Sequence, residues 1–360
     1  MKILVINPGS TSTKVAVFED DKLLFDETLR HSSEQLKAFP DIFSQQDFRK
    51  KIIHDFLSKH NLKMSDFAGI AARGGPLPPS EGGTYIVDEN LLFATRNLYV
   101  TEHPSLLAAL IAADLGKEAN LKSYIVDPVS VDEWHELSRF SGMPELPRIS
   151  LSHALNMRAV ARRTARDLGK KYEELNLIII HLGGGISVSA HEKGRQIDAN
   201  NANEDGPFSP ERTGTLPVSP LVKLCFSGKY SLQKMKNLIV REGGMTAYLG
   251  INDVKEALKL ADSGDQKARS VLDSMIYQVA KETGKMAVVL KGKIDAIAVS
   301  GGIAYNESLV KILRERIEFL GPVRVYPGED EMEALALGTL RVLRGEEKAK
   351  NFACKADSIR

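Results

Sequence analysis

Apolar residues along the chain follow two patterns, short continuous runs and recurrences every three or four positions. Short runs rich in leucine and β-branched residues predict buried strands. One such run opens the chain, and residues 2–18 are predicted to form a strand, a turn of small residues and a second strand. A similar unit reappears at 177–190, where the turn contains three glycines. In each copy the first strand ends in a polar side chain, Asn7 or His181. Two copies half a chain apart predict an internal duplication.

Between and after these hairpins, helical and strand-like segments alternate. Residues 1–30 are expected to form three strands, and residues 76–83, with three prolines and two glycines, predict a loop. Apolar recurrence at helical spacing predicts helices over 47–60, 105–115, 151–168, 216–228, 232–241, 254–261, 266–290, 309–320 and 331–344. Further buried strands are expected over 67–72, 123–126, 294–299 and 323–326.

This order of elements predicts an α/β fold of two lobes with a cleft between them. Each half opens with a meander and continues with alternating helices and strands. The first domain is expected to comprise residues 1–170 and a C-terminal segment, 332–360, that packs back on it. The second domain is expected to comprise residues 171–331.

Polar side chains and glycines stand at the ends of the predicted strands, namely Asn7, Arg73, Asp127, His181 and the pair Gly301–Gly302. Ligands of such sheets bind beyond the carboxyl ends of the strands. Glycine and hydroxyl turns leave backbone N–H groups free to surround phosphate. No Gly-x-x-x-x-Gly-Lys-Ser/Thr sequence occurs, so a P-loop is excluded. We therefore expect the two repeated turns to face each other across a nucleotide tail.

Two arginines lie in loops that contain glycine. Arg73 precedes a diglycine, and Arg212 is followed closely by Gly214. Most arginines are solvated surface charges, but one fixed beside glycines at a strand end suits forked binding of an anion. We expect Arg73 and Arg212 to clamp an anionic group.

Acidic and histidine side chains leave alternatives open. Asp127 either begins a turn or faces a metal ion or phosphoryl group, and Glu331 either complements a helix dipole or organises Mg²⁺ through water. His181 is the stronger histidine candidate because its position copies Asn7, and His153 stands at a predicted helix start. The other histidines, such as His31 and His191, are expected at the surface or in loops.

Composition narrows the classes of function. The formal net charge of the 360-residue chain is +1, so no positive excess favours nucleic acid or an anionic membrane. The two cysteines, Cys225 and Cys354, imply no disulfide framework, which is typical of a cytoplasmic protein. No apolar run reaches the ~20 residues of a membrane helix.

Taken together, these residues resemble the acetate and butyrate kinase family, in the superfamily that includes Hsp70 and actin. The resemblance runs along essentially the whole chain and rests on the motifs around Asn7, Arg73, Ser152–His153, Arg212 and Glu331, with the two glycine turns. It implies two duplicated actin/Hsp70-like (ribonuclease H-like) domains with an interdomain nucleotide cleft. It also implies ATP- and Mg²⁺-dependent phosphorylation of a short-chain fatty acid, by a homodimer or higher homo-oligomer.

The resemblance assigns roles to individual residues. Catalytic roles would fall to Arg73, Asp127, His153, His181 and Arg212. Nucleotide-binding roles would fall to Asn7, Ser10, Ser12, Lys14, Gly183, Gly184, Gly185, Asp253, Gly301, Gly302, Ile303 and Asn306. The metal ligands would be Asn7 and Glu331.

Departures from the family pattern favour butyrate or isobutyrate as the substrate. Acetate kinases carry Phe-His-Gly where this chain has Arg148, Ile149 and Ser150, and a branched residue where it has Gly75. Gly75 is expected to leave room for a longer acyl tail. An acetate or propionate kinase on the same scaffold is the nearest alternative. A chaperone-like ATPase, in which nucleotide drives conformation, is the alternative from another class.

Overall fold

The computed structural model describes residues 1–353 and divides into two compact units. One consists of Met1–Asp132 with Asp330–Arg360, and the other of Glu133–Glu329. This division differs from the predicted boundary at residue 170, because α5 (Ala154–Asp167) packs on strands of the second unit. Residues 354–360 of the predicted C-terminal segment lie outside the described part of the chain.

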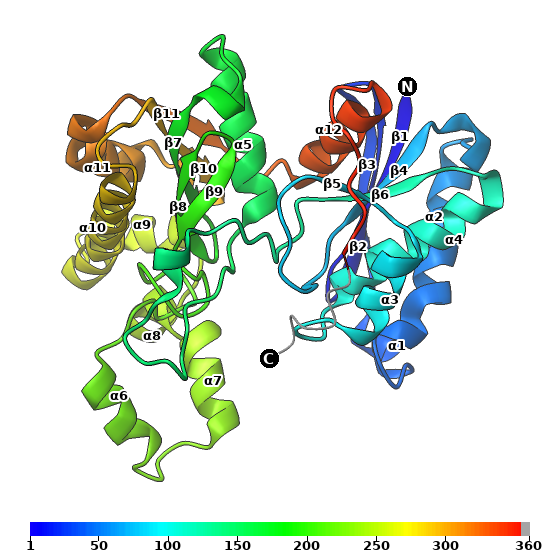
Figure 1. Cartoon of the computed structure of the whole chain (residues 1–360). Helices are drawn as coiled ribbons and strands as arrows, with labels where there is room; N and C mark the ends of the chain where they lie inside the picture. Colours follow the sequence, from blue (N-terminus) through cyan, green and yellow to red (C-terminus); the bar gives the residue numbers. More distant parts are fainter. Residues whose placement is uncertain (354–360) are drawn as a thin grey trace. The chain divides into compact units, whose positions relative to one another are not determined.

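The first unit is built on a six-stranded sheet with the order β3-β2-β1-β4-β6-β5 (Figure 1). Its strands are β1 (Lys2–Pro8), β2 (Ser12–Glu19), β3 (Lys22–Arg30), β4 (Gly69–Arg73), β5 (Thr84–Ile86) and β6 (Ser123–Val126). The first three form the predicted antiparallel meander, whereas β4 and β6 run parallel to β1. The carboxyl ends of β1, β4 and β6 therefore share one edge of the sheet.

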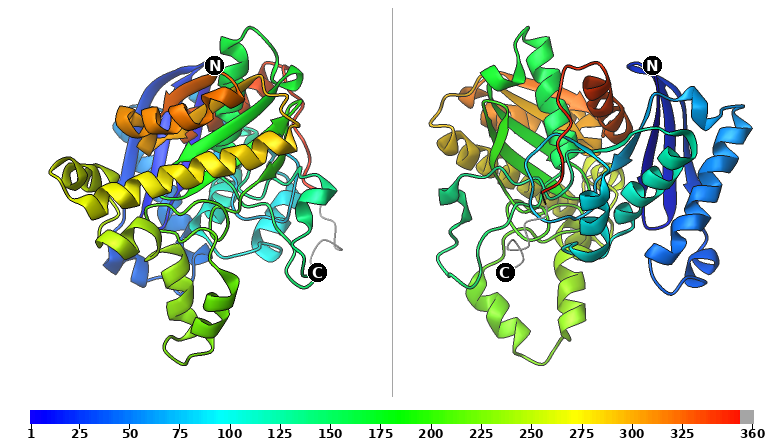
Figure 2. Two further views of the ribbon diagram at one scale, coloured as in Figure 1. Left: turned by 90° about the vertical axis from the view of Figure 1, so that its left-hand side faces the viewer. Right: turned by 45° about the vertical axis from the view of Figure 1, so that its right-hand side comes forward.

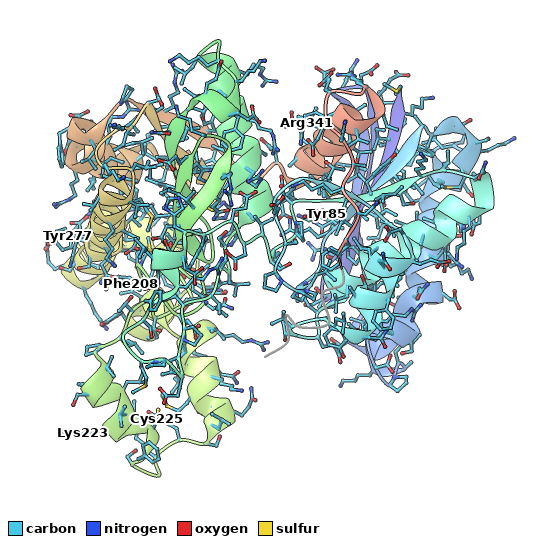
Figure 3. The ribbon with its side chains drawn as sticks, in the orientation of Figure 1. Tyr85, Phe208, Lys223, Cys225, Tyr277 and Arg341 are labelled. Atoms are coloured by element: carbon cyan, nitrogen blue, oxygen red, sulfur yellow. The ribbon has the colours of Figure 1, made fainter. Side chains whose placement is uncertain are left out.

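Helices cover both faces of this sheet. On one face α2 (Gln46–Lys59) and α4 (Leu107–Ala119) close a core that includes Leu4, Ile6 and Ile70. On the other, α12 (Glu331–Leu343) contacts β1, β4 and β6, which confirms that the final helix packs back on the first half. Two short helices, α1 (Ser33–Lys37) and α3 (Glu89–Asn97), complete the unit. After α12, which carries Arg341, the chain returns to β5 beside Tyr85 (Figure 3) and pairs there through Lys350.

The second unit repeats this arrangement. Its sheet has the order β11-β10-β7-β8-β9, formed by β7 (Asn176–Leu182), β8 (Ile186–Glu192), β9 (Arg195–Ala199), β10 (Ala296–Gly301) and β11 (Val323–Pro327). An antiparallel meander is again followed by two parallel strands, so β7 corresponds to β1 and β10 to β4. The predicted duplication is confirmed.

Helices also cover both faces of the second sheet. The long helix α10 (Gln266–Val289) crosses one face, as the yellow helix over the green strands in Figure 2 shows, and α9 (Val254–Asp262) and α11 (Glu307–Ile317) flank it. On the opposite face lies α5, whose apolar residues pack against β7 and β10. The remaining helices are α6 (Val218–Cys225), α7 (Leu232–Val240) and α8 (Gly244–Leu249). Among residues 1–353, the structure contains no helix with the length and apolarity that a bilayer crossing requires.

Two histidines that were expected at the surface are buried. His31 is 5% exposed and shares a hydrogen bond with Thr13 Oγ1, and His191 is fully buried beside Ser189 and Tyr172. A hydroxyl partner satisfies an imidazole inside a core, and sequence spacing gives no sign of such a partner.

Gly75 does not leave the space that was predicted for a longer acyl tail. A Cβ atom at this position would lie 2.6 Å from Cδ2 and 3.0 Å from Cα of Leu106. Leu106 is 1% exposed and fills the position itself. The absence of a side chain at Gly75 is therefore a packing requirement.

We expect Gly75→Val to destabilise the protein, because the added methyl groups would overlap Leu106. Overpacking a filled core costs about 1–3 kcal/mol, which corresponds to a fall in Tm of roughly 2–10 °C. Thermal unfolding followed by circular dichroism measures this change. The control is Gly284→Ala in α10, where a Cβ atom would meet nothing within 4 Å and alanine favours the helix. A Tm for Gly75→Val that is equal to or above that of the wild type would contradict the packing role.

Candidate functional site

Three polar side chains meet at the carboxyl ends of β1 and β4 in the first unit. Arg73, the last residue of β4, donates from Nη1 to Oε1 of Glu331 at 2.5 Å. Asn7 in β1 donates from Nδ2 to the other carboxylate oxygen, Oε2, at 2.9 Å. Glu331 reaches both as the first residue of α12. Because one carboxylate engages both partners, the Arg73 guanidinium and the Asn7 amide have fixed positions at this edge.

Asp127 follows β6 at the same edge and is 2% exposed. Its Oδ1 accepts a hydrogen bond from the Gly83 N–H at 2.7 Å, and its own N–H donates to the Gly83 carbonyl at 3.0 Å. The backbone of Asp127 has a φ of 38°, which is uncommon for any residue other than glycine. Asp127 thus ties the end of β6 to the backbone of Gly83.

The turn between β1 and β2 is held by a buried arginine that the sequence interpretation missed. Arg49 donates from Nη1 to the carbonyls of Gly9 and Ser12, at 2.9 and 3.0 Å. Burial lowers the pKa of Arg49 to about 10, so the side chain stays charged at neutral pH. Ser10 and Lys14 are exposed, and Ser12 is partly exposed. The predicted phosphate-binding side chains of this turn are therefore accessible.

His181 is the penultimate residue of β7, the central strand of its sheet, and is 2% exposed. Its Nδ1 lies 2.9 Å from Oδ1 of Asn156, which also accepts from the Ser300 hydroxyl at 2.9 Å. Its Nε2 lies 3.2 Å from Oε1 of Glu329. The His153 ring stacks on it, with centroids 4.1 Å apart. These three neighbours, Asn156, Glu329 and His153, fix the His181 ring near the end of its strand.

The glycine turn 183–185 needs the absence of side chains. A Cβ atom at Gly183 would lie 2.9 Å from Nε2 of His181 and 2.8 Å from Oε1 of Glu329. A Cβ atom at Gly185 would overlap the guanidinium of Arg212. The two catalytic candidates His181 and Arg212 therefore pack directly against the turn.

Arg212 lies in a loop that its own hydrogen bonds help to order. Its Nη1 donates to the Ala202 carbonyl at 2.8 Å, and its backbone N–H donates to Ser209 Oγ at 3.2 Å. Burial lowers the pKa of Arg212, and the adjacent Glu211 carboxylate opposes this shift. An arginine remains protonated under such a shift, so a partly desolvated positive charge faces the glycine turn.

A cavity of about 310 Å³ lies beside this turn in the second unit. Cavities that bind small molecules measure roughly 300–1,000 Å³. Six of the predicted nucleotide-binding residues line it, namely Gly183, Gly184, Asp253, Gly302, Ile303 and Asn306. Asp253 and Asn306 also cap helices there, because their side-chain oxygens accept from Lys255 N–H and Leu309 N–H. Of the other predicted glycines, Gly185 packs against Arg212, and Gly301 leads into the 3₁₀ turn Gly302–Tyr305.

The cavity also contains further charged, aromatic and polar groups. Lys255 contributes a positive charge, Tyr305 a ring that is 66% exposed, and Asn252 and Glu329 contribute polar groups. An exposed ring beside glycines offers a stacking surface for a base, and an ammonium group suits phosphate. The acidic run of residues 329–331 was the one sequence signal for Glu329, whereas Asn156 lies on a helix face and gave none.

Metal-binding capacity is limited to a few oxygens. Across residues 1–353, no three His, Cys, Asp or Glu side chains gather as a ligand set. Glu331 offers one carboxylate, and Asn7 one amide oxygen, while both Glu331 oxygens already accept hydrogen bonds. Mg²⁺ commonly binds through one or two carboxylates plus waters and substrate phosphates. The donor set fits a Mg²⁺ ion that arrives with nucleotide.

Comparisons with known proteins identify the relatives of this chain. Residues 151–331 match the model of the acetokinase family. Butyrate kinase 1 of Clostridium acetobutylicum is 48% identical to this chain, over 98% of the chain and 99% of that protein. A probable butyrate kinase of Thermotoga petrophila is 50% identical, over 98% of each.

Solved structures share the fold at low sequence identity. The acetate kinase of Porphyromonas gingivalis superposes with a TM-score of 0.80 at 17% identity, over 95% of this chain and 99% of that one. A propionate kinase from Francisella tularensis gives a TM-score of 0.74 at 18% identity, over 94% and 98%. Identity near one half along almost the entire length, with the matching family model, shows that this chain belongs to the acetokinase family.

Proposed function

We propose that this chain is a butyrate kinase, which transfers the terminal phosphoryl group of ATP to butyrate or isobutyrate in a reversible reaction. ATP-dependent phosphorylation of short-chain carboxylates is the activity of its family, and the relatives named butyrate kinase support the choice of acid. The observation that carries the chemistry is the charged guanidinium of Arg212 packed against a glycine turn that lines a nucleotide-sized cavity.

The reaction needs no general base. A carboxylic acid with a pKa near ~4 is already ionised at neutral pH, so a carboxylate oxygen can attack directly. The new P–O bond forms as the bond between the terminal phosphorus and the ADP oxygen breaks, and the products are acyl phosphate and ADP. Catalysis then consists of positioning and of neutralising charge on the moving phosphoryl group.

The charged side chains would have separate roles in positioning the substrates and in neutralising charge. Arg73, whose orientation Glu331 fixes, would bind the carboxylate of the acid. Arg212 would stabilise the charge on the phosphoryl group, and His181, with His153 stacked on it, would support the glycine turn that holds the phosphates. Mg²⁺, when bound with ATP near Asn7 and Glu331, would neutralise phosphate charge. In-line transfer requires an oxygen of the acid to be aligned with the terminal phosphorus of ATP, opposite the bond that breaks.

Two further expectations concern the location and the assembly of the enzyme. The enzyme is cytoplasmic, as its cysteine content and substrates suggest. It assembles as a homodimer or a higher homo-oligomer. An acetate or propionate kinase is the alternative on the same scaffold, and a chaperone-like ATPase would hydrolyse ATP without any acid.

ATP turnover should require both Mg²⁺ and a short monocarboxylate. The reason is that the acid is the phosphoryl acceptor and that no residue is assigned to activate water. A coupled assay of ADP release, with and without butyrate and with EDTA as the metal-free control, measures this requirement. Equal ADP release with and without acid would favour the ATPase alternative.

Arg212→Ala should lower kcat by at least ~10³, because one cationic group contributes about that much to phosphoryl transfer. The affinity for ATP should change little, since the glycine turn and not Arg212 holds the nucleotide. Arg73→Ala should in addition raise KM for the acid. Steady-state kinetics and nucleotide titration separate the two effects. A near-normal kcat for Arg212→Ala would leave that loop without a catalytic role.

Butyrate or isobutyrate should give a higher kcat/KM than acetate. Each methylene that becomes buried contributes about 0.8 kcal/mol, so two give roughly 10- to 100-fold preference. Initial rates with acids of two to five carbons measure this preference. Preference for acetate or propionate would restore the alternative substrate assignment while leaving the reaction class intact.

A further inference from the structure

Arg148 stands where acetate kinases carry a phenylalanine, and none of the roles above uses it. We propose that Arg148 is a positioning residue that holds Arg212 in place for phosphoryl transfer, an inference that rests on the proposed function. Arg148 acts on Arg212 indirectly. The two side chains are linked through the segment 199–205, which begins at the last residue of β9.

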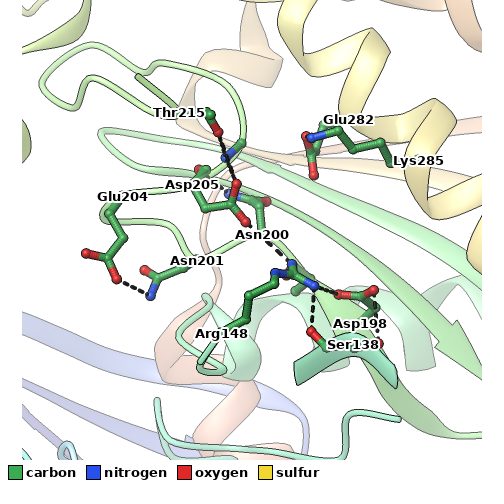
Figure 4. Close-up of polar contacts among 12 residues, drawn as sticks. Ser138, Arg148, Asp198, Asn200, Asn201, Glu204, Asp205, Thr215, Glu282 and Lys285 are labelled. Carbon is green, nitrogen blue, oxygen red and sulfur yellow. Dashed lines mark hydrogen bonds and ion pairs between the residues drawn. The ribbon is translucent and has the colours of Figure 1, made fainter. Parts of the chain in front are cut away.

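Arg148 holds both ends of this segment (Figure 4). Its Nη2 donates to the Ala199 carbonyl at 2.9 Å and to Oδ2 of Asp205 at 3.4 Å. Its Nη1 donates to Oδ1 of Asp198 at 3.2 Å and to the Ser138 carbonyl at 2.8 Å. The guanidinium lies over the Trp134 ring, 4.8 Å from the centroid. Four acceptors and an aromatic face leave it little freedom to move.

The middle of the same segment holds Arg212. The Ala202 carbonyl accepts from Arg212 Nη1 at 2.8 Å, and the Ala202 N–H donates to the Leu151 carbonyl at 3.0 Å. A displacement of Ala202 would therefore move the acceptor that orients the Arg212 guanidinium. Leu151 follows Arg148 by three residues, so both supports of the segment come from one stretch of chain.

Asp205 links Arg148 to the loop that carries Arg212. Its Oδ1 accepts from the Gly206 N–H at 2.7 Å and from the Thr215 hydroxyl at 3.0 Å. The Thr215 N–H donates back to the Gly206 carbonyl at 3.0 Å, which closes the loop 206–215 at its base. One carboxylate thus joins Arg148 to the base of this loop (Figure 4).

The contacts require an arginine at position 148. A guanidinium presents five N–H donors in a rigid fork, so it can engage Ala199, Asp198 and Asp205 together while stacking on Trp134. A lysine would keep the charge but offers a single flexible ammonium. A methionine would fill similar space with neither charge nor donors.

The primary experiment compares Arg148→Met with Arg195→Met. Arg195 is an exposed arginine on β9, which makes it a matched control. Arg148→Met should lower kcat by roughly 10- to 100-fold, because misplacement of a catalytic group by about 1 Å has an effect of that size. The KM for ATP should stay within about twofold, and Arg148→Lys should recover part of the loss. A loss in Arg148→Met no larger than in Arg195→Met, or full recovery in Arg148→Lys, would overturn the proposal.

A double-mutant cycle tests whether the effect acts through Arg212. In the Arg212→Ala background, Arg148→Met should change kcat by less than about twofold, since the group that it positions is gone. An undiminished effect in that background would show that Arg148 acts by another route and would overturn the proposal.

An NMR measurement tests the positioning role of Arg148 independently of catalytic turnover. The Nε–Hε resonance of Arg212, assigned by its loss in Arg212→Ala, should shift in Arg148→Met and in Asp205→Asn and stay unchanged in Arg195→Met. An unchanged resonance in both variants would overturn the proposal even if activity fell. Absence of acid-dependent turnover in the wild type would instead contradict the proposed function.

Discussion

The carboxylate of Glu331 is the interaction on which the first unit depends. It accepts from Arg73 at the end of β4 and from Asn7 in β1, so a single side chain fixes the functional ends of two parallel strands. An ion pair that is largely shielded from water holds its geometry only while both partners remain. The same carboxylate begins α12. The orientation of Arg73 is therefore coupled to the docking of the last helix on the sheet.

The duplicated fold supports two different chemistries on one topology. Equivalent strands place Asn7 near the end of β1 and His181 near the end of β7, and each is followed by a tight turn that contains glycine. The first unit then presents charged groups around Glu331, whereas the second presents bare glycines beside a cavity. Sheet order decides where ligands bind, and the side chains at the strand ends decide what is bound.

The sequence pattern was sufficient to predict the architecture, because the spacing of apolar residues is regular in both repeats. The three-stranded openings, the strand at 123–126 and the long helix near 266–290 needed no tertiary information. Short elements such as β5 and α3 were missed, since packing and not local preference defines them. Site residues with a backbone signature, such as Gly183 or Arg73, were visible in the sequence. Arg49 and Asn156 were not, because they act through partners distant in the chain.

The first unit is assembled from both ends of the chain, which has a consequence for synthesis on the ribosome. Residues 133–329 form a unit of their own and leave the ribosome before the segment that starts at Asp330. Until that segment emerges, the face of β1, β4 and β6 that α12 covers has no partner within the first unit. The nascent polypeptide must therefore carry an exposed apolar sheet while its middle folds. Chaperone binding to the growing chain would be concentrated in that interval.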